Sequence, residues 1–202
     1  MKTILAIGPH PDDIELGCFG TMCRHKAEGD DIHFLVLTKG EGGSDTGNRI
    51  AEARESAGIA GANIILENLK DRYISEGLET ISAMETVITR INPDVVYIPS
   101  MNDTHQDHRS AYRAALVATR MVSEVYIYQS PSTTTDFKPN LYVDITDFIE
   151  MKIQAVRIHS SQGGKVYMAA EAIEGLAKAN AFQVFLNGRY AEAFEVQKHI
   201  RK

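Results

Sequence analysis

Short runs of apolar, mostly β-branched residues alternate along this chain with longer stretches of helical periodicity. The runs predict five buried strands, at residues 3–8, 32–38, 63–66, 94–99 and 125–128. The stretches with helical spacing lie between and after them, at residues 17–28, 48–61, 76–91, 107–119, 146–159 and 166–181. Strands and helices that alternate in this order form parallel sheets, because each helical crossover returns the chain to the same end of the sheet.

The element order predicts an α/β fold, a Rossmann-like three-layer αβα sandwich around a mainly parallel sheet of five or more strands. A further pattern at residues 190–196 is typical of a last strand or an edge extension of that sheet. No internal repeat, low-complexity tract or linker interrupts the chain, so we expect a single domain over residues 1–202. Such sheets bind ligands beyond the carboxyl ends of their strands, usually between the first and the fourth.

Composition and charge exclude several classes of function. The chain carries 21 basic and 27 acidic residues, a net charge of −6, and no basic run, so we expect no nucleic-acid partner. Its apolar stretches are far shorter than the roughly 20 residues that span a bilayer, and no leader pattern opens the chain. We therefore expect a soluble cytoplasmic protein without membrane insertion. Two cysteines, Cys18 and Cys23, are too few for a disulfide framework and predict free thiols.

The residue types that bind metals gather in the loops after the first and fourth predicted strands. The first loop reads GPHPDDIELG and the second reads SMNDTHQDH. His10 and Asp13 lie three residues apart across a turn that Pro11 stiffens, so both side chains can face one point while Asp12 faces another. With His108 from the second loop, they could supply the three ligands of a catalytic zinc and leave a position for water.

Each loop also has a purely structural interpretation. Acidic residues are common at helix N-termini, where the helix dipole stabilises them, and three acids of the first loop fit that pattern. In the second loop, Thr104 and Asp107 have the spacing of a capping box. Because both clusters follow the strands between which the crevice is expected, the two together favour a metal site.

The sequence resembles the PIG-L/LmbE-like deacetylases, metal-dependent enzymes that remove the acetyl group from N-acetylglucosamine-type sugars. Their opening motif, His-Pro-Asp-Asp-x-Glu, stands at residues 10–15, and their second motif, His-x-Asp-His, at residues 105–108. Looser matches occur at Arg49-x-x-Glu52, at Asp71 and at residues 152–162. The resemblance covers nearly the whole chain and implies one PIG-L/LmbE-like deacetylase domain over residues 1–202.

The resemblance implies a role for each motif residue. His10, Asp13 and His108 would be metal ligands, Asp12 the general base, and His105 the group that stabilises or protonates the tetrahedral intermediate. The cofactor would be Zn²⁺, with Fe²⁺ as an alternative, because imidazole and carboxylate ligands suit both ions. The partner would be a small-molecule N-acetylated sugar, and family members are often homo-oligomers.

Four further residues have expected supporting roles. We interpret Glu15 as a group that accepts a hydrogen bond from a ligand histidine or from the loop backbone, with a plain helix-start acid as the alternative. We hypothesise that the Asp107 carboxylate hydrogen-bonds His105 and raises its pKa. Arg49 and Asp71 follow the second and third strands and would contact the substrate, unless they form a surface ion pair.

Two loops on the crevice side are candidates for substrate contact. Residues 39–47 form a glycine-rich segment that we interpret as a lid or substrate loop, and residues 129–140 would shape specificity. The favoured function is hydrolysis of an N-acetyl amino sugar with release of acetate. The alternatives are a deacylase of another N-acyl small molecule and a nucleotide-binding Rossmann module. The nucleotide module is disfavoured because acids stand where pyrophosphate requires backbone amides.

Overall fold

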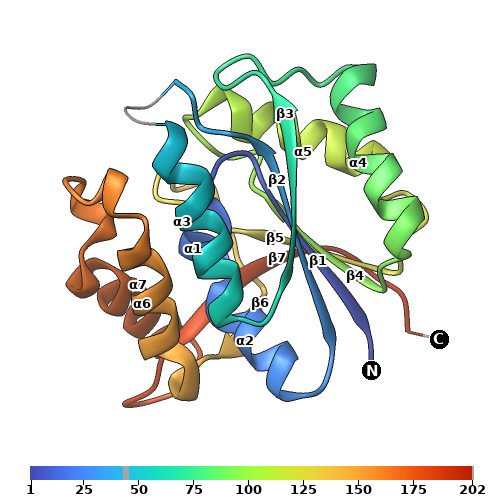
Figure 1. Ribbon diagram of the computed structural model, residues 1–202. Coiled ribbons are helices and arrows are strands. Elements are labelled where there is room, and N and C mark those ends of the chain that lie inside the picture. Colours follow the sequence, from blue (N-terminus) through green and yellow to red (C-terminus); the bar gives the residue numbers. More distant parts are fainter. Residues whose placement is uncertain (43–45, 202) are drawn as a thin grey trace.

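A seven-stranded sheet forms the centre of the computed structural model, which describes residues 1–42 and 46–201 (Figure 1). The strand order is β3-β2-β1-β4-β5-β7-β6. The strands are β1 (Thr3–Gly8), β2 (Asp31–Thr38), β3 (Asn63–Leu69), β4 (Val95–Pro99), β5 (Glu124–Tyr128), β6 (Leu141–Asp144) and β7 (Ala191–His199). The first five are parallel, whereas β7 runs antiparallel to β5 and β6. The predicted α/β fold with a mainly parallel sheet is confirmed.

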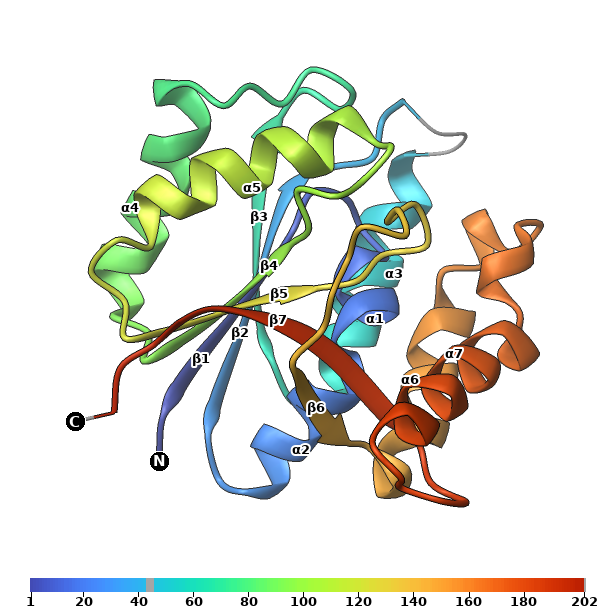
Figure 2. The same ribbon diagram turned by 180° about the vertical axis from the view of Figure 1, so that it is seen from behind.

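Helices cover both faces of this sheet (Figures 1 and 2). One face carries α4 (Leu78–Ile91) and α5 (Gln106–Ala118). The other carries α1 (Asp13–Gly17), α2 (Phe19–Ala27), α3 (Thr46–Ile59), α6 (Ile149–Ile158) and α7 (Ala170–Gln183). Among the described residues there are also three short 3₁₀ turns, η1 (Thr146–Phe148), η2 (Ser160–Gln162) and η3 (Val166–Met168).

Alternate residues of the central strand enter two different apolar cores. Ile4 and Ala6 of β1 pack in the core under α2, whereas Leu5 and Ile7 pack in the core under α4 and α5. This follows from the two-residue period of a strand, which sends successive side chains to opposite faces. Both faces of β1 are therefore buried, in agreement with its uninterrupted apolar sequence.

The helices differ from the predicted ones at three places. The helix expected at residues 17–28 starts at Phe19 as α2, and the short helix α1, which was not predicted, precedes it across a break at Cys18. The helix expected at 146–159 opens with the 3₁₀ turn η1, and the one expected at 166–181 opens with η3. At the break, the Glu192 carboxylate accepts hydrogen bonds from the backbone N–H groups of Gly20 and Thr21. The break is thus stabilised by a residue of β7, which is distant in the sequence.

The first loop follows β1 and the second loop follows β4. The two loops meet because β1 and β4 are parallel neighbours in the sheet. From β1 the chain winds toward β2 on one side and later passes β1 to form β4 on the other, so the strand order reverses between β1 and β4. The carboxyl ends of both strands open into one crevice at this point, as predicted. Cys18 and Cys23 are buried, free thiols, also as predicted. Within the described chain, every helix is too short or too polar to cross a membrane.

Candidate active site

The first loop is a closed turn that separates its two adjacent aspartates. The backbone N–H of His10 donates to Asp13 Oδ2 at 2.8 Å, and the N–H of Asp13 approaches the His10 carbonyl at 3.4 Å. Asp12, between them, has a φ of 108°, a left-handed conformation that is uncommon for a residue other than glycine. Such strain often occurs at functional positions. Asp12 and Asp13 consequently contact different neighbours, as the spacing predicted.

Three histidines from the two loops surround Asp13. Nitrogen atoms of His10, His105 and His108 lie within 4.8 Å of one another. The Asp13 carboxylate lies between two of the rings, with Oδ2 at 3.1 Å from His10 Nδ1 and Oδ1 at 3.2 Å from His108 Nε2. The structure thus brings together the three residues expected to hold a metal, and it places His105 beside them.

Carboxylates also face the other nitrogen of each of these two rings. His10 Nε2 lies 3.1 Å from both Asp71 Oδ1 and Asp107 Oδ2, and His108 Nδ1 lies 2.9 Å from Asp103 Oδ2. Metal-binding histidines commonly carry such a partner, because it fixes the tautomer and the orientation of the ring. The arrangement leaves His10 Nδ1 and His108 Nε2 as the nitrogens that face Asp13.

The site holds a surplus of buried negative charge. Five carboxylates of the cluster are buried, those of Asp12, Asp13, Asp71, Asp103 and Asp107. Burial alone would lower the pKa of His108, but the charge of Asp13 and hydrogen bonds to both Asp103 and Asp13 raise it to about 9. Burial also acts to lower the pKa of His10. Hydrogen bonds to Asp107, Asp13 and Asp71 outweigh this effect and raise that pKa well above its usual value.

This charge distribution fits a divalent cation. The carboxylates that keep protons on the histidines would equally stabilise a positive ion, to which the two imidazoles would bind in their neutral form. Imidazole together with carboxylate is a donor set that suits zinc and ferrous iron. The residues present therefore match the metal implied by the sequence motifs.

The Asp12 side chain contacts an arginine. Arg49 Nη2 lies 3.3 Å from Asp12 Oδ1 and donates to the Pro11 carbonyl at 2.7 Å, while Nη1 donates to Gly40 at 3.2 Å. Burial and the neighbouring Asp13 charge raise the pKa of Asp12 to about 6, against the opposing effect of Arg49. A carboxylate with this pKa can both accept and donate a proton near neutrality.

The hypothesis that the Asp107 carboxylate hydrogen-bonds His105 and so raises the pKa of His105 is wrong. The Asp107 carboxylate faces His10 and accepts from the backbone N–H groups of Arg72 and Ile74 instead. His105 is the N-cap of α5, and its Nδ1 accepts from the Asp107 backbone N–H at 3.2 Å. Burial and the nearby charges of His10 and His108 lower the pKa of His105. Its imidazole is thus a neutral group whose proton lies on Nε2.

Two other local interpretations need correction. Thr104 is not the cap of α5, because His105 takes that position and the Thr104 hydroxyl donates to the Ser132 carbonyl at 3.2 Å. Glu15 was expected to accept from a ligand histidine or the loop backbone; a hydrogen bond from its own backbone N–H helps to lower its pKa, but the histidine it contacts is His159 and not an expected ligand. The Ser56 hydroxyl donates to Glu15 Oε1, and His159 Nε2 lies 3.2 Å from the same atom.

A polar cavity of about 270 Å³ opens above the cluster. Arg49 and Asp71 line it, as do parts of both predicted substrate loops. The remaining wall residues, which sequence reasoning missed, are Arg72, Lys165 and Tyr167. These three residues belong to no sequence motif, so no pattern in the sequence indicates a role for them. Asp103, which was also missed, lies in the second loop together with His105 and His108. The predicted lid at 39–47 includes residues 43–45, which lie outside the described residues.

A Rossmann-like sheet with a histidine–aspartate cluster at its switch point agrees with the resemblance of the sequence to the PIG-L/LmbE-like proteins. The family model described as PIG-L, GlcNAc-PI de-N-acetylase, matches residues 5–119. The chain belongs to the PIG-L family.

Individual relatives agree with this assignment. The chain is 36% identical over 169 residues to the uncharacterized deacetylase YaiS of Escherichia coli, covering 79% of this chain and 91% of that protein. It is 30% identical to the diacetylchitobiose deacetylase of Thermococcus kodakarensis, covering 80% and 70%. The crystal structure of the conserved protein TT1542 from Thermus thermophilus superposes with a TM-score of 0.89 at 29% identity, covering 100% and 97%.

Proposed function

We propose that this chain is a metal-dependent hydrolase that removes the acetyl group from an N-acetylated amino sugar, a GlcNAc-type sugar or conjugate, and releases acetate. The observation that carries the proposal is the Asp13 carboxylate between His10 and His108, with Asp12 beside it but bound to Arg49. The names of the family model and of the diacetylchitobiose deacetylase support an N-acetyl sugar as substrate. Another N-acyl small molecule is the alternative substrate for the same chemistry.

His10 Nδ1, His108 Nε2 and Asp13 would hold the metal, for which we propose zinc, with ferrous iron as the alternative. When bound, such an ion supplies Lewis acidity, which polarises an amide carbonyl and lowers the pKa of a water molecule toward neutrality. Asp71, Asp107 and Asp103 would keep the two rings oriented.

Asp12 acts as the general base in this scheme. Arg49 contacts its Oδ1, so Oδ2 would accept the proton of the attacking water. Because the pKa of Asp12 is raised to about 6, the carboxylate can then return that proton to the leaving amine.

His105 stabilises the charge that develops on the carbonyl oxygen. Its Nδ1 is occupied by a backbone N–H, so Nε2 carries the proton and donates it in a hydrogen bond to the oxyanion. A neutral donor suffices for this role, so no charged histidine is required. Arg49 and Asp71 line the same cavity, where they would contact the sugar. We further propose a cytoplasmic homo-oligomer, in line with the family resemblance.

The test is a screen of N-acetylglucosamine, N,N′-diacetylchitobiose and other N-acyl compounds, scored by free amine and acetate with and without chelator. We expect metal-dependent amine release.

Asp12→Asn should lower kcat at least about 100-fold and keep its bound metal, since general bases typically contribute that much. His108→Ala should lose both metal and activity, and Asp147→Asn, at an exposed aspartate, should change neither. Absence of amine release from every compound by metal-loaded protein would refute the proposal.

A further inference from the structure

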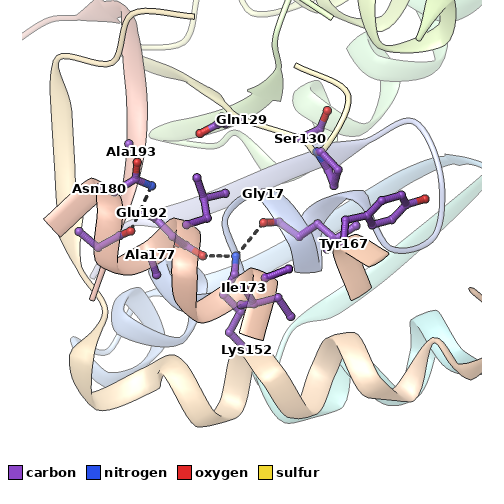
Figure 3. Close-up of a pocket in the computed structure, with 15 residues that line it drawn as sticks. Gly17, Gln129, Ser130, Lys152, Tyr167, Ile173, Ala177, Asn180, Glu192 and Ala193 are labelled. Carbon is purple, nitrogen blue, oxygen red and sulfur yellow. Dashed lines mark hydrogen bonds and ion pairs between the residues drawn. The ribbon is translucent and has the colours of Figure 1, made fainter. Parts of the chain in front are cut away.

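A second cavity, of about 170 Å³, adjoins the polar cavity of the site. Figure 3 shows the side chains that line it. The two share Pro131, from the loop after β5, and Tyr167, from η3. The second cavity extends from there between α1, α7 and β7. A ligand seated above the histidines can therefore reach it past these two side chains.

The second cavity presents no free charge. Its charged wall residues are Lys152 and Glu192, which form a buried ion pair with Nζ at 2.6 Å from Oε1 (Figure 3). Lys152 Nζ also donates to the Leu16 carbonyl at 2.8 Å, and Glu192 Oε2 accepts from the Thr21 hydroxyl at 2.6 Å. Because these charges are satisfied within the protein, they do not require an ionic ligand.

The remaining walls are mostly aliphatic, with Gln129, Ser130 and Asn180 as their uncharged polar members. Leu16, Ile173, Leu176 and Ala177 line the cavity, and Ala172 stands exposed on α7 at its edge. The polar cavity differs sharply, because histidines, aspartates and arginines surround it. Two adjoining cavities of such different character match a ligand with one polar and one apolar part.

We propose that the second cavity binds an apolar group of the substrate, an unbranched chain of about six carbons attached to the amino sugar. A volume of about 170 Å³ is close to that of a cavity of roughly 150 Å³ that binds benzene, a ligand of six carbons. The chain has two chemical sources, the group glycosidically linked to the sugar or the N-acyl chain itself. This inference rests on the proposed function, because it assigns the apolar part of that substrate.

The test compares three substrates of the metal-loaded protein: N-acetylglucosamine, its hexyl glycoside, and N-hexanoylglucosamine. One of the two hexyl compounds should have a kcat/KM at least about tenfold above N-acetylglucosamine, because each buried methylene contributes up to about fourfold. The compound that gains identifies the source of the chain. Ala172→Phe should remove the gain by filling the edge of the cavity. Ala179→Phe, at an exposed alanine of α7 that does not line the cavity, should leave it intact.

A binding measurement separates this inference from the deacetylase proposal. By calorimetry with Asp12→Asn protein, either hexyl glucoside should bind at least about tenfold more tightly than methyl glucoside, or N-hexanoylglucosamine should bind at least about tenfold more tightly than N-acetylglucosamine, and Ala172→Phe should abolish the difference. If this difference is found without turnover of any substrate, the cavity assignment stands and the deacetylase proposal fails. The cavity assignment is overturned if neither hexyl substrate nor hexyl glucoside gains, or if Ala179→Phe removes the gain as fully as Ala172→Phe.

Discussion

Single carboxylates organise the candidate site by contacting two groups at once. Asp13 separates the rings of His10 and His108, and Asp107 joins His10 to the backbone of residues 72 and 74. Each carboxylate therefore fixes a histidine relative to a second element. The position of a ligand nitrogen depends on such contacts as much as on its own loop.

Asp107→Asn should weaken metal binding. The Arg72 and Ile74 N–H groups donate to different oxygens of Asp107, so the asparagine oxygen can keep only one of these hydrogen bonds, and the negative charge beside His10 Nε2 is lost. We expect the affinity for zinc to fall about 10- to 100-fold, measured by competition with a chromophoric chelator. Asp103→Asn should act similarly through His108, and Asp147→Asn should have no effect. An unchanged affinity would show that the Asp107 contact does not support the metal site.

The sequence predicts the histidines of this cluster and four of its five buried carboxylates, but not Asp103 and not all of the contacts that these residues make. His10, Asp12 and Asp13 are recognisable because local spacing within one turn decides which of them can face a common point. Glu15 instead contacts Ser56 of α3 and His159 after α6. Those contacts depend on which helices pack across the loop, and no local pattern in the first loop encodes that packing.

At the scale of elements, the buried strands were the most predictable. β1, β2 and β4 are buried along nearly their whole length, so their sequences are continuous apolar runs. β6 was not predicted, because its four residues are only half-buried at the sheet edge. The break between α1 and α2 also escaped prediction, since its capping carboxylate comes from Glu192 in β7.

The five-residue helix α1 is positioned by tight packing on a buried tyrosine. A Cβ atom at Gly17 would overlap the ring of Tyr128, whose hydroxyl donates to the Ile7 carbonyl at 2.8 Å. Gly17→Ala should therefore lower the free energy of unfolding by about 1–3 kcal/mol, measured by urea denaturation. Gly58→Ala in α3 meets no neighbouring atom and should raise it by about 0.5–1 kcal/mol. Equal effects of the two substitutions would contradict the packing.

A buried glutamate connects α3 to η2. Glu52 accepts from the Ser161 hydroxyl at 2.6 Å, the Ser161 N–H at 2.9 Å and the Ser160 hydroxyl at 3.1 Å. Burial alone would raise the pKa of Glu52, but these hydrogen bonds lower it overall. A carboxyl with a lowered pKa stabilises the fold above its unfolded pKa, and this contribution disappears as the pH falls through its folded pKa.

Glu52→Gln should consequently destabilise the protein at pH 7 by about 1 kcal/mol, because it weakens charge-assisted hydrogen bonds. The difference from the unmodified protein should shrink as the pH falls below about 4.5, the usual pKa of a glutamate. Urea denaturation at several pH values measures it. Glu55→Gln, at an exposed position of the same helix, is the matched control. A difference that is constant from pH 7 to pH 3 would exclude an effect of the Glu52 charge.

For the whole molecule, the sheet concentrates buried negative charge at one edge, the carboxyl ends of β1 and β4. Without a cation, this charge is balanced by protons on His10 and His108 and by Arg49. Both cavities open from the same edge, and β7 adds a wall to the second of them. A cation bound there would therefore stabilise the region on which the rest of the site is built.

Zinc should accordingly raise the Tm of chelator-treated protein by about 5–10 °C at a concentration about 100-fold above its Kd. Binding at that excess contributes about 2.7 kcal/mol, and each kcal/mol shifts the Tm of a chain of this size by about 2–4 °C.

Because Asp13 and Asp103 keep a proton on His108 with a pKa of about 9, zinc must displace that proton. At a fixed zinc concentration, the shift should hence grow from pH 6 to pH 8. Magnesium, which prefers oxygen ligands, should give a smaller shift, and His108→Ala should abolish the zinc effect. An equal zinc shift in His108→Ala would place the bound ion elsewhere in the protein.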